Sequence, residues 1–371
     1  MANKYDLKEM NRNNIYHLIY NSNGISKQQI ATQLGLSLPT VSQNLLQLRQ
    51  EGLIMESGTF NSTGGRKPRI IQCVPDVRLA LGMDITAHHL NLVLTDLMGT
   101  VLANQRLQLK YENTDRYYEQ VREQLEAFVC RSGVQEERIL GVGISLPAII
   151  AADHRMITHM TALDAPEELY QRFAPYIPYP YLLFNDANSG GMAEFWHRDT
   201  AEQIVYISLS NSVGGSIVLS RQVYPGNDQR SGEFGHLTLV DNGRPCYCGQ
   251  RGCANAYCNA RLLSDMADGD LAQFFARVER GDAALIEQFK EYLHYLSMLV
   301  HQVRMCFDCD IILGGYVGSF LEAHLPELAI QVQNRDPYKA PTSYLTCSQF
   351  KLEAAALGAA LYYVEQYIQQ I

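Results

Sequence analysis

One pattern occurs twice in the chain and restricts its fold more than any other feature. Residues 79–109 alternate apolar and polar residues in three strand-like runs, with tight turns expected at Thr86-Ala87-His88 and Met98-Gly99. A similar group recurs at 203–226. After the first group, helical character covers about 112–132 and the apolar strand 138–146 comes next. After the second group, a later strand at 309–318 leads to an amphipathic helix over 353–370. Two such copies predict an α/β body of two lobes around a cleft.

The length and composition are consistent with a cytoplasmic protein of two or three domains. The chain has 371 residues, of which 47% are hydrophobic and 19% charged. It opens on the polar stretch MANKYDLKEM, without the features of a signal peptide. The longest apolar run, 139–152, is too short to cross a bilayer, so we expect no membrane association. In a reducing compartment, the nine cysteines are expected to be thiols or metal ligands.

The first 70 residues differ in charge from the rest. They hold eight lysines and arginines against four acidic residues, whereas the whole chain has a net charge of −9. A basic head on an acidic body suggests two separate tasks.

The head has the pattern of a helix-turn-helix. Apolar spacing predicts a helix over 8–21; Ser26 and Gln29 form a capping-box signature for a second helix, and Gly35 ends it. Ser37 can cap a third helix, whose inward face carries Val41, Leu45 and Leu48. The outer face is predicted to offer hydroxyl and amide groups that can read bases in the major groove: Thr40, Gln43, Asn44 and Gln47.

Two strands that form a wing are predicted after the third helix. Residues 51–73 read as strand, turn and strand, and Arg66 and Lys67 make the turn cationic and suited to a narrow minor groove. The alternative is a small helical protein-interaction domain with a basic linker. The helix order, cap, turn glycine and wing together favour DNA binding.

Four potential metal ligands lie within eighteen residues of one another. They follow the spacing His236-x9-Cys246-x-Cys248-x4-Cys253. Zinc takes four nitrogen or sulfur ligands in a tetrahedron, and four protein ligands leave no position for a reactive water. The segment therefore predicts a structural zinc site, against the alternative of free thiols in a loop.

The body resembles the ROK family of sugar kinases and sugar-responsive repressors, which have an actin-like, duplicated ribonuclease-H-like fold. The matching stretches include VGISLPA, FNDANSGGMAE, SGEFGHLTL…CYCGQRGC and ILGGYVG, and they span nearly all of 79–364. A winged-helix head resembles the repressor branch, typified by xylose and N-acetylglucosamine regulators. The expected domains are a DNA-binding head over 1–72, a first lobe over 77–190 with 356–371, and a second lobe over 191–355 that carries the zinc loop.

The sugar site is expected from residue chemistry and from the resemblance together. Carboxylates and amides match pairs of sugar hydroxyls, and Asn185 and Asp186 follow a buried strand. Asp186 is a sugar acceptor, a helix cap, or the general base if the protein is a kinase. The resemblance assigns sugar contacts to Glu233 and His236, with the zinc fixing the histidine ring. It also places a glutamate where this chain has Asn255, which leaves the identity of the sugar open.

Phosphate-binding features of the family's kinases are partly missing. The resemblance implies a Gly-Gly-Thr turn after Asp84, but this chain has no glycine from Ile85 to His89, which hinders a close approach of backbone amides to phosphate. The second loop, 210–215, keeps only half of its pattern. We therefore expect ATP binding to be lost and the protein not to be an enzyme.

Head and body together thus predict a transcriptional regulator, a repressor of carbohydrate-use genes. It is expected to bind operator DNA as a homodimer or dimer of dimers, and a sugar or sugar phosphate between its lobes. Two alternatives are an active sugar kinase with a regulatory head and a repressor controlled by a protein partner, with a vestigial sugar pocket.

Overall fold

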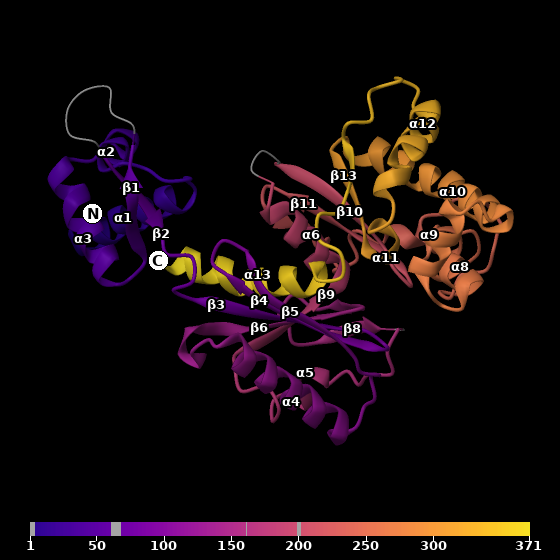
Figure 1. The fold of residues 1–371 in the computed structure, drawn as a ribbon, viewed down its shortest axis with the longest axis horizontal. Coiled ribbons are helices and arrows are strands. Elements are labelled where there is room, and N and C mark those ends of the chain that lie inside the picture. Colours follow the sequence, from indigo (N-terminus) through magenta and orange to yellow (C-terminus); the bar gives the residue numbers. More distant parts are fainter. Residues whose placement is uncertain (1–3, 61–67, 161, 199–201) are drawn as a thin grey trace.

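The computed structural model describes residues 4–60, 68–160, 162–198 and 202–371 (Figure 1). The head lies at one end of the molecule and two α/β lobes follow it. Within the described ranges, no helix is long and apolar enough to cross a membrane.

The head contains three helices and a two-stranded antiparallel sheet. Its elements are α1 (Lys4–Tyr20), α2 (Lys27–Leu34), α3 (Leu38–Gln50), β1 (Ile54–Thr59) and β2 (Arg69–Cys73). The Ser26 hydroxyl accepts from the Gln29 N–H, and the Gln29 side chain accepts from the Ser26 N–H, so the capping box is confirmed. Gly35 ends α2 with a left-handed φ of 62°, and the Ser37 hydroxyl caps α3.

The outer face of α3 differs from the prediction at one residue. Asn44 is buried, and its side-chain amide donates to the Thr40 carbonyl one turn earlier. At i+3 from Val41 and i−1 from Leu45, Asn44 lies on the side of α3 that packs into the head. The prediction that Asn44 faces outward toward DNA is therefore wrong.

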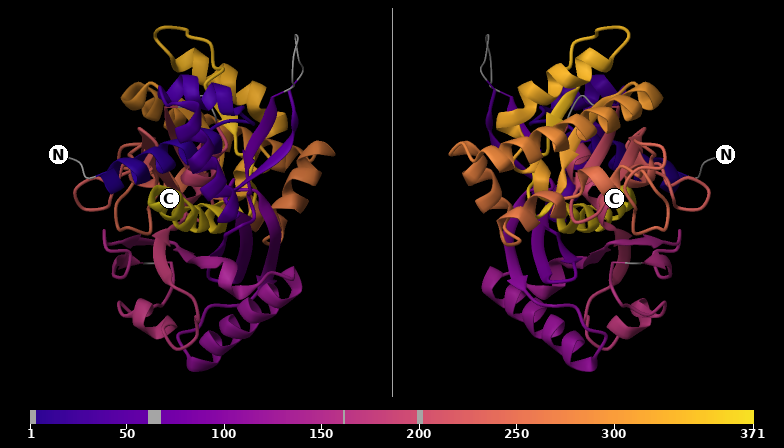
Figure 2. Two further views of the ribbon diagram at one scale, coloured as in Figure 1. Left: turned by 90° about the vertical axis from the view of Figure 1, so that its left-hand side faces the viewer. Right: turned by 90° about the vertical axis from the view of Figure 1, so that its right-hand side faces the viewer.

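The first lobe is built on a five-stranded sheet in the order β5-β4-β3-β6-β9. Its strands are β3 (Leu79–Ile85), β4 (His89–Asp96), β5 (Val101–Gln108), β6 (Ile139–Leu146) and β9 (Tyr181–Asn185). The first three strands are antiparallel, and β6 and β9 are parallel to β3. Helix α4 (Asp115–Ser132) covers the face that points away from the second lobe (Figure 2). A small hairpin, β7 (Ala148–Ile150) and β8 (Ile157–Met160), and the short helix α5 (Leu169–Phe173) complete it.

The second lobe repeats this plan with the order β12-β11-β10-β13-β14. Its strands are β10 (Gln203–Leu209), β11 (Val213–Leu219), β12 (Gln222–Val223), β13 (Asp310–Gly314) and β14 (Leu345–Cys347). Its helices are α7 (Asn255–Cys258), α8 (Arg261–Ser264), α9 (Leu271–Glu279), α10 (Ala283–Phe307), α11 (Gly315–Gly318) and α12 (Leu325–Arg335). The strand expected over 309–318 is shorter, because Gly315 takes a left-handed φ of 74° and α11 begins there.

Two helices lie between the sheets and join the lobes (Figure 1). Helix α6 (Asp186–Trp196) packs on β10 and β11, whereas α13 (Ala354–Gln370) packs on β3, β4 and β6, and the two helices pack on each other. They approach closely at Gly358, where a Cβ atom would lie 1.7 Å from the Ser189 carbonyl oxygen. The lobe boundary expected between residues 190 and 191 therefore falls inside a continuous helix.

The C-terminal end of α13 reaches the head. Ile371 is buried in the same apolar core as Ile15, Leu48 and Ile71. The Arg12 guanidinium donates to the Ile371 carbonyl at 2.7 Å. One helix thus contacts the centre of the body at its start and the core of the head at its end.

Candidate functional site

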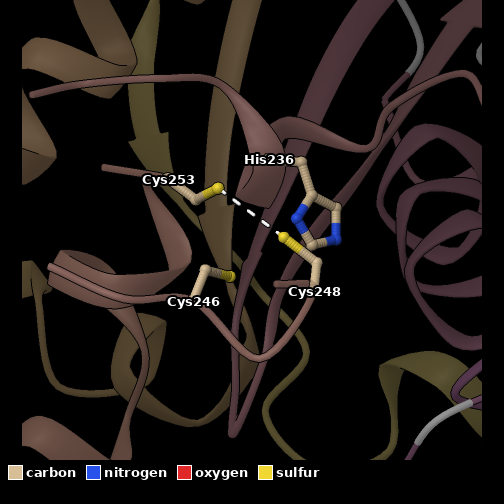
Figure 3. A group of neighbouring side chains, drawn as sticks. All are labelled: His236, Cys246, Cys248 and Cys253. Atoms are coloured by element: carbon tan, nitrogen blue, oxygen red, sulfur yellow. Dashed lines mark hydrogen bonds between the residues drawn. The ribbon is translucent and has the colours of Figure 1, made fainter. Parts of the chain in front are cut away.

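His236, Cys246, Cys248 and Cys253 converge in the second lobe (Figure 3). One ligand atom from each residue lies within 4.8 Å of the others, and the Sγ atoms of Cys248 and Cys253 are 3.8 Å apart. Residues seventeen positions apart therefore form a possible metal site, with Cys253 buried and Cys248 exposed.

The loop that carries the cysteines is shaped by two glycines and anchored at its base. Gly249 and Gly252 take left-handed φ values of 86° and 83°, and the Cys246 N–H donates to the Gln250 carbonyl across the turn. The Arg244 guanidinium pairs with Glu291 of α10 at 2.8 Å. The sulfur atoms are thus held in place by the local backbone and by a contact to a long helix.

The two ring nitrogens of His236 face different surroundings. Nδ1 is buried without a hydrogen-bond partner among the described residues, on the side of the ring toward the sulfur atoms (Figure 3). Nε2 lies 3.3 Å from the Tyr247 hydroxyl and 3.9 Å from Glu233 Oε2. One nitrogen is therefore available to a metal and the other to a polar ligand.

Asn185 and Asp186 stand where β9 passes into α6. Asn185 is the cap: its Oδ1 accepts from the Asn188 N–H at 2.9 Å, and its Nδ2 donates to the Ala148 carbonyl at 3.0 Å. The alternative that Asp186 caps this helix is therefore wrong. Burial, followed by the charge of Asp84, raises the pKa of Asp186 from 3.8 to about 7.

Glu233 extends this acidic group from the other lobe. Its charge and that of Asp84 both act on Asp186, which places these carboxylates in one neighbourhood. Burial raises the pKa of Glu233 above its usual value, although the charges of His236, His159 and Arg230 act in the opposite direction. The arrangement offers carboxylate acceptors and a histidine nitrogen to a ligand with several hydroxyl groups.

Asn255 has a structural contact that sequence reasoning missed. It is buried, and its side-chain oxygen accepts from the Val213 N–H at 2.8 Å. Val213 begins β11 within the segment that matches the second phosphate loop. One acceptor position of the Asn255 oxygen is therefore taken by the backbone, and its amide NH2 has no partner within the described residues.

Tyr316 was also missed, and it spans the two lobes. Its ring from α11 lies 5.7 Å from the Arg106 guanidinium carbon on β5. Burial, then the charge of Asp84, raises the pKa of Tyr316 to about 12. The neighbouring Gly315 N–H donates to the Tyr206 hydroxyl at 3.1 Å. No local pattern in the sequence signals this contact, because Tyr316 and Arg106 lie more than 200 positions apart.

The predicted DNA-reading residues separate into three groups. Gln43 is exposed, whereas Thr40 and Gln47 are half-buried and hydrogen-bonded to Ser37 and Glu51, respectively. Asn44 is buried. Arg66 and Lys67 lie outside the described residues.

A pocket of about 490 Å³ lies beside, rather than at, the carboxylates. Most of residues 224–234, together with Leu237 and the end of α10, line it, and they include Glu233 and Cys306. Asp186 and His236 do not line this pocket, so we do not place a sugar there.

Comparison with known proteins assigns both parts of the chain. The ROK family model matches residues 80–366. The chain belongs to the ROK family. A winged helix-turn-helix DNA-binding model matches residues 11–55. This protein therefore combines a ROK body with a winged helix-turn-helix head.

Several ROK proteins resemble this chain over most of their length. It is 23% identical over 386 residues to the xylose repressor of Bacillus subtilis strain 168, across 100% of this chain and 99% of the relative. It is 26% identical over 277 residues to the transcriptional dual regulator NagC of Escherichia coli K12, across 71% and 67%.

Solved structures show the same fold. A ROK family transcriptional regulator, a homologue of the E. coli Mlc protein, superposes with a TM-score of 0.76 at 20% identity, over 98% of this chain and 96% of that one. The ROK hexokinase of Thermus thermophilus gives 0.64 at 23% identity, over 79% and 100%. The kinase lacks a counterpart for about a fifth of this chain, which agrees in size with the head.

Proposed function

We propose that this protein is a transcriptional repressor of carbohydrate-use genes that binds operator DNA through its head and a sugar or sugar phosphate through its body. The observation that carries the proposal is the physical link between the two parts: α13 packs on the first lobe and ends in the core of the head. The named repressors among its relatives support it, since the xylose repressor matches the whole chain.

The His/Cys cluster fits a structural zinc ion. Sulfur atoms about 2.3 Å from a tetrahedral zinc lie about 3.8 Å apart, as the Sγ atoms of Cys248 and Cys253 do. The buried Nδ1 of His236 without a partner supplies the fourth position. When bound, zinc cross-links this loop and fixes the histidine ring; four protein ligands leave no site for a catalytic water.

The sugar-binding role is proposed for Asp186, Glu233 and Nε2 of His236, with Asn185 and the amide of Asn255 as further contacts. Their carboxylates accept from sugar hydroxyls, and the histidine nitrogen complements them. Because Asp186 belongs to the first lobe and Glu233 to the second, one sugar that bonds to both favours the lobes approaching each other. Such a movement would reach the head through α13.

We propose that kinase activity is lost because the two loops that match the phosphate-binding loops of the family's kinases are occupied by the protein's own contacts. The turn after Asp84 is closed by Thr86 and His89, whose backbone groups bond to each other, and Asn255 occupies the Val213 N–H. Tyr316 reaches across to Arg106 in the same region. The competing hypothesis, an active sugar kinase, is favoured by the half-buried Asp186, whose pKa of about 7 suits a general base.

Two assays decide between these functions. A gel shift with the full chain and the DNA upstream of its own gene should show binding that weakens steeply with salt, because phosphate contacts release counterions. ADP release with a panel of hexoses should stay at background. Sugar-dependent ADP release that disappears in Asp186→Asn would support the kinase instead.

We further propose a homodimer or a dimer of dimers as the DNA-binding form. A single recognition helix reads one half-site, and pseudo-palindromic operators match a two-fold symmetric protein. Light scattering of the full chain alone and with DNA measures this directly.

A further inference from the structure

One exposed stripe of α3 has a composition that predicts which bases it reads. Pro39, Gln43, Leu46 and Gln50 follow the spacing i, i+4, i+7 and i+11, which places them on one side of a helix. All four are exposed. The buried side of α3 is made by Val41, Asn44, Leu45 and Leu48. The stripe therefore lies on the side of α3 that faces away from the core of the head.

The polar groups of α3 do not all reach this surface. Asn44 is buried, and the Gln47 amide donates to the Glu51 carboxylate at 3.0 Å. Gln43 is exposed one turn after the N-terminus of α3, the part of a recognition helix that contacts base edges. Beside it, 56% of Leu46 is exposed, so its side chain contributes little to the core of the head.

The chemistry of the major groove matches these two side chains. A glutamine amide pairs with N6 and N7 of adenine, and an apolar side chain packs against the 5-methyl group of thymine. Gln43 and Leu46 are three positions apart, a helical rise of about 4.5 Å, close to the rise of about 3.4 Å between base pairs. Neighbouring base pairs are therefore within reach of the two residues.

We infer that each operator half-site contains an adenine read by Gln43 and, at an adjacent base pair, a thymine whose methyl group packs on Leu46. This inference rests on the proposed function, DNA binding by the head. The thymine methyl is the more specific part of it, because an exposed leucine in a basic surface has no polar contact to offer a phosphate.

The charges around the stripe favour DNA over a protein as its occupant. The head has twice as many basic as acidic residues over 1–70. Lys27 lies beside the stripe, with its Nζ atom 2.9 Å from the Ser42 hydroxyl, and the exposed Arg49 on the same helix forms an ion pair with Glu56. The two exposed leucines of α3, Leu38 and Leu46, are also too small an apolar area for a stable protein interface.

The test replaces single thymines with deoxyuridine, which pairs identically but lacks the 5-methyl group. The full-length protein first selects its preferred duplex from a randomised pool. Each thymine of the selected site is then replaced in turn and Kd is measured by fluorescence anisotropy. We expect one position in each half-site where uracil weakens binding about fourfold, the effect of one methyl group.

Two variants assign this effect to its residue. Leu46→Ala should bind the thymine duplex about fourfold more weakly, and it should show no further loss with uracil, because both changes remove the same contact. Gln43→Ala should weaken binding about tenfold and lose the preference for adenine at the neighbouring base pair. Leu102→Ala is the matched control, since Leu102 is 47% exposed on β5 in the body.

The outcomes separate the inference from the function on which it rests. Sequence-specific binding that is indifferent to uracil at every position overturns the inference, as does a uracil effect that persists in Leu46→Ala. In both cases the proposed function stands. A protein that selects no sequence and binds no duplex contradicts the proposed function itself.

Discussion

At the scale of single residues, sequence spacing predicted which side chains lie together better than it predicted which side chains bond to the backbone. The four metal-ligand candidates were predicted from their spacing, because residues on one short loop stay close together in space. Their ligand atoms lie within 4.8 Å of one another. Asn44 was wrongly predicted to face DNA, and the backbone contact of Asn255 was not predicted, for a shared reason. Both are polar residues whose side chains bond to a nearby or distant backbone group, and no pattern in the sequence marks such a partner.

Asp186 gives a prediction about pH. Because the pKa of Asp186 is raised from 3.8 to about 7, the folded state holds this proton more tightly than the unfolded state. The stability that comes from this protonation is complete below pH 4 and is lost as the pH rises to 7. Asp186→Asn removes the titration, so between pH 5 and 8 its free energy of unfolding should fall less than that of the wild type, by about 2 kcal/mol. Urea titrations at both pH values measure this, and equal losses would contradict the assignment.

Asn255 gives a prediction about stability. Asn255→Ala leaves the buried Val213 N–H without its acceptor, which should lower the free energy of unfolding by about 1–3 kcal/mol. Asn334→Ala, an exposed asparagine on α12, is the control and should change little. Thermal unfolding followed by circular dichroism compares the two variants. A melting temperature equal to that of the control would show that this hydrogen bond is unimportant.

At the scale of elements, local signals predicted the head and most strands well. Caps at Ser26 and Ser37 act within one turn of helix, so the sequence contains all of the information needed. The end of β13 was missed because a glycine at position 315 permits both an extended and a left-handed backbone, and the choice depends on packing against Tyr206. Contacts between elements, such as Tyr316 with Arg106, have no local signal.

The cysteine loop is predicted to depend on its metal. If the proposed zinc is bound, Cys248→Ser should abolish its binding and lower the melting temperature, because a loop built on two glycines loses its cross-link. Cys130→Ser, which changes an exposed cysteine on α4, should retain both. Zinc content by mass spectrometry of the purified variants is the readout. Full zinc content in Cys248→Ser would exclude that residue as a ligand.

The end of α13 is predicted to support DNA binding without contacting DNA. Ile371→Asp places a charge in the apolar core of the head, so affinity for operator DNA should fall at least about tenfold. Stabilisation of the body by its sugar should be unchanged. The control is Gln370→Asp at the neighbouring exposed position. Equal DNA affinity of the two variants would show that this contact does not shape the head.

At the scale of the whole molecule, the duplicated pattern predicted two lobes, and both sheets have the same strand plan. What the sequence left open was how the head is connected to them. In the structure, α13 makes this connection: it contacts the first lobe, the linking helix α6 and the head. A ligand that changes the approach of the lobes therefore has a continuous path of packed side chains to the DNA-binding surface.

We propose that sugar binding and DNA binding are coupled in this protein. The most direct measurement is the Kd of the full chain for its upstream DNA, by fluorescence anisotropy, with and without each member of a panel of sugars and sugar phosphates. We predict that one compound shifts this Kd at least about fivefold, and that DNA shifts the Kd of that compound by the same factor, as linkage requires. DNA binding that no compound changes, with a compound that still binds the body, would contradict the account.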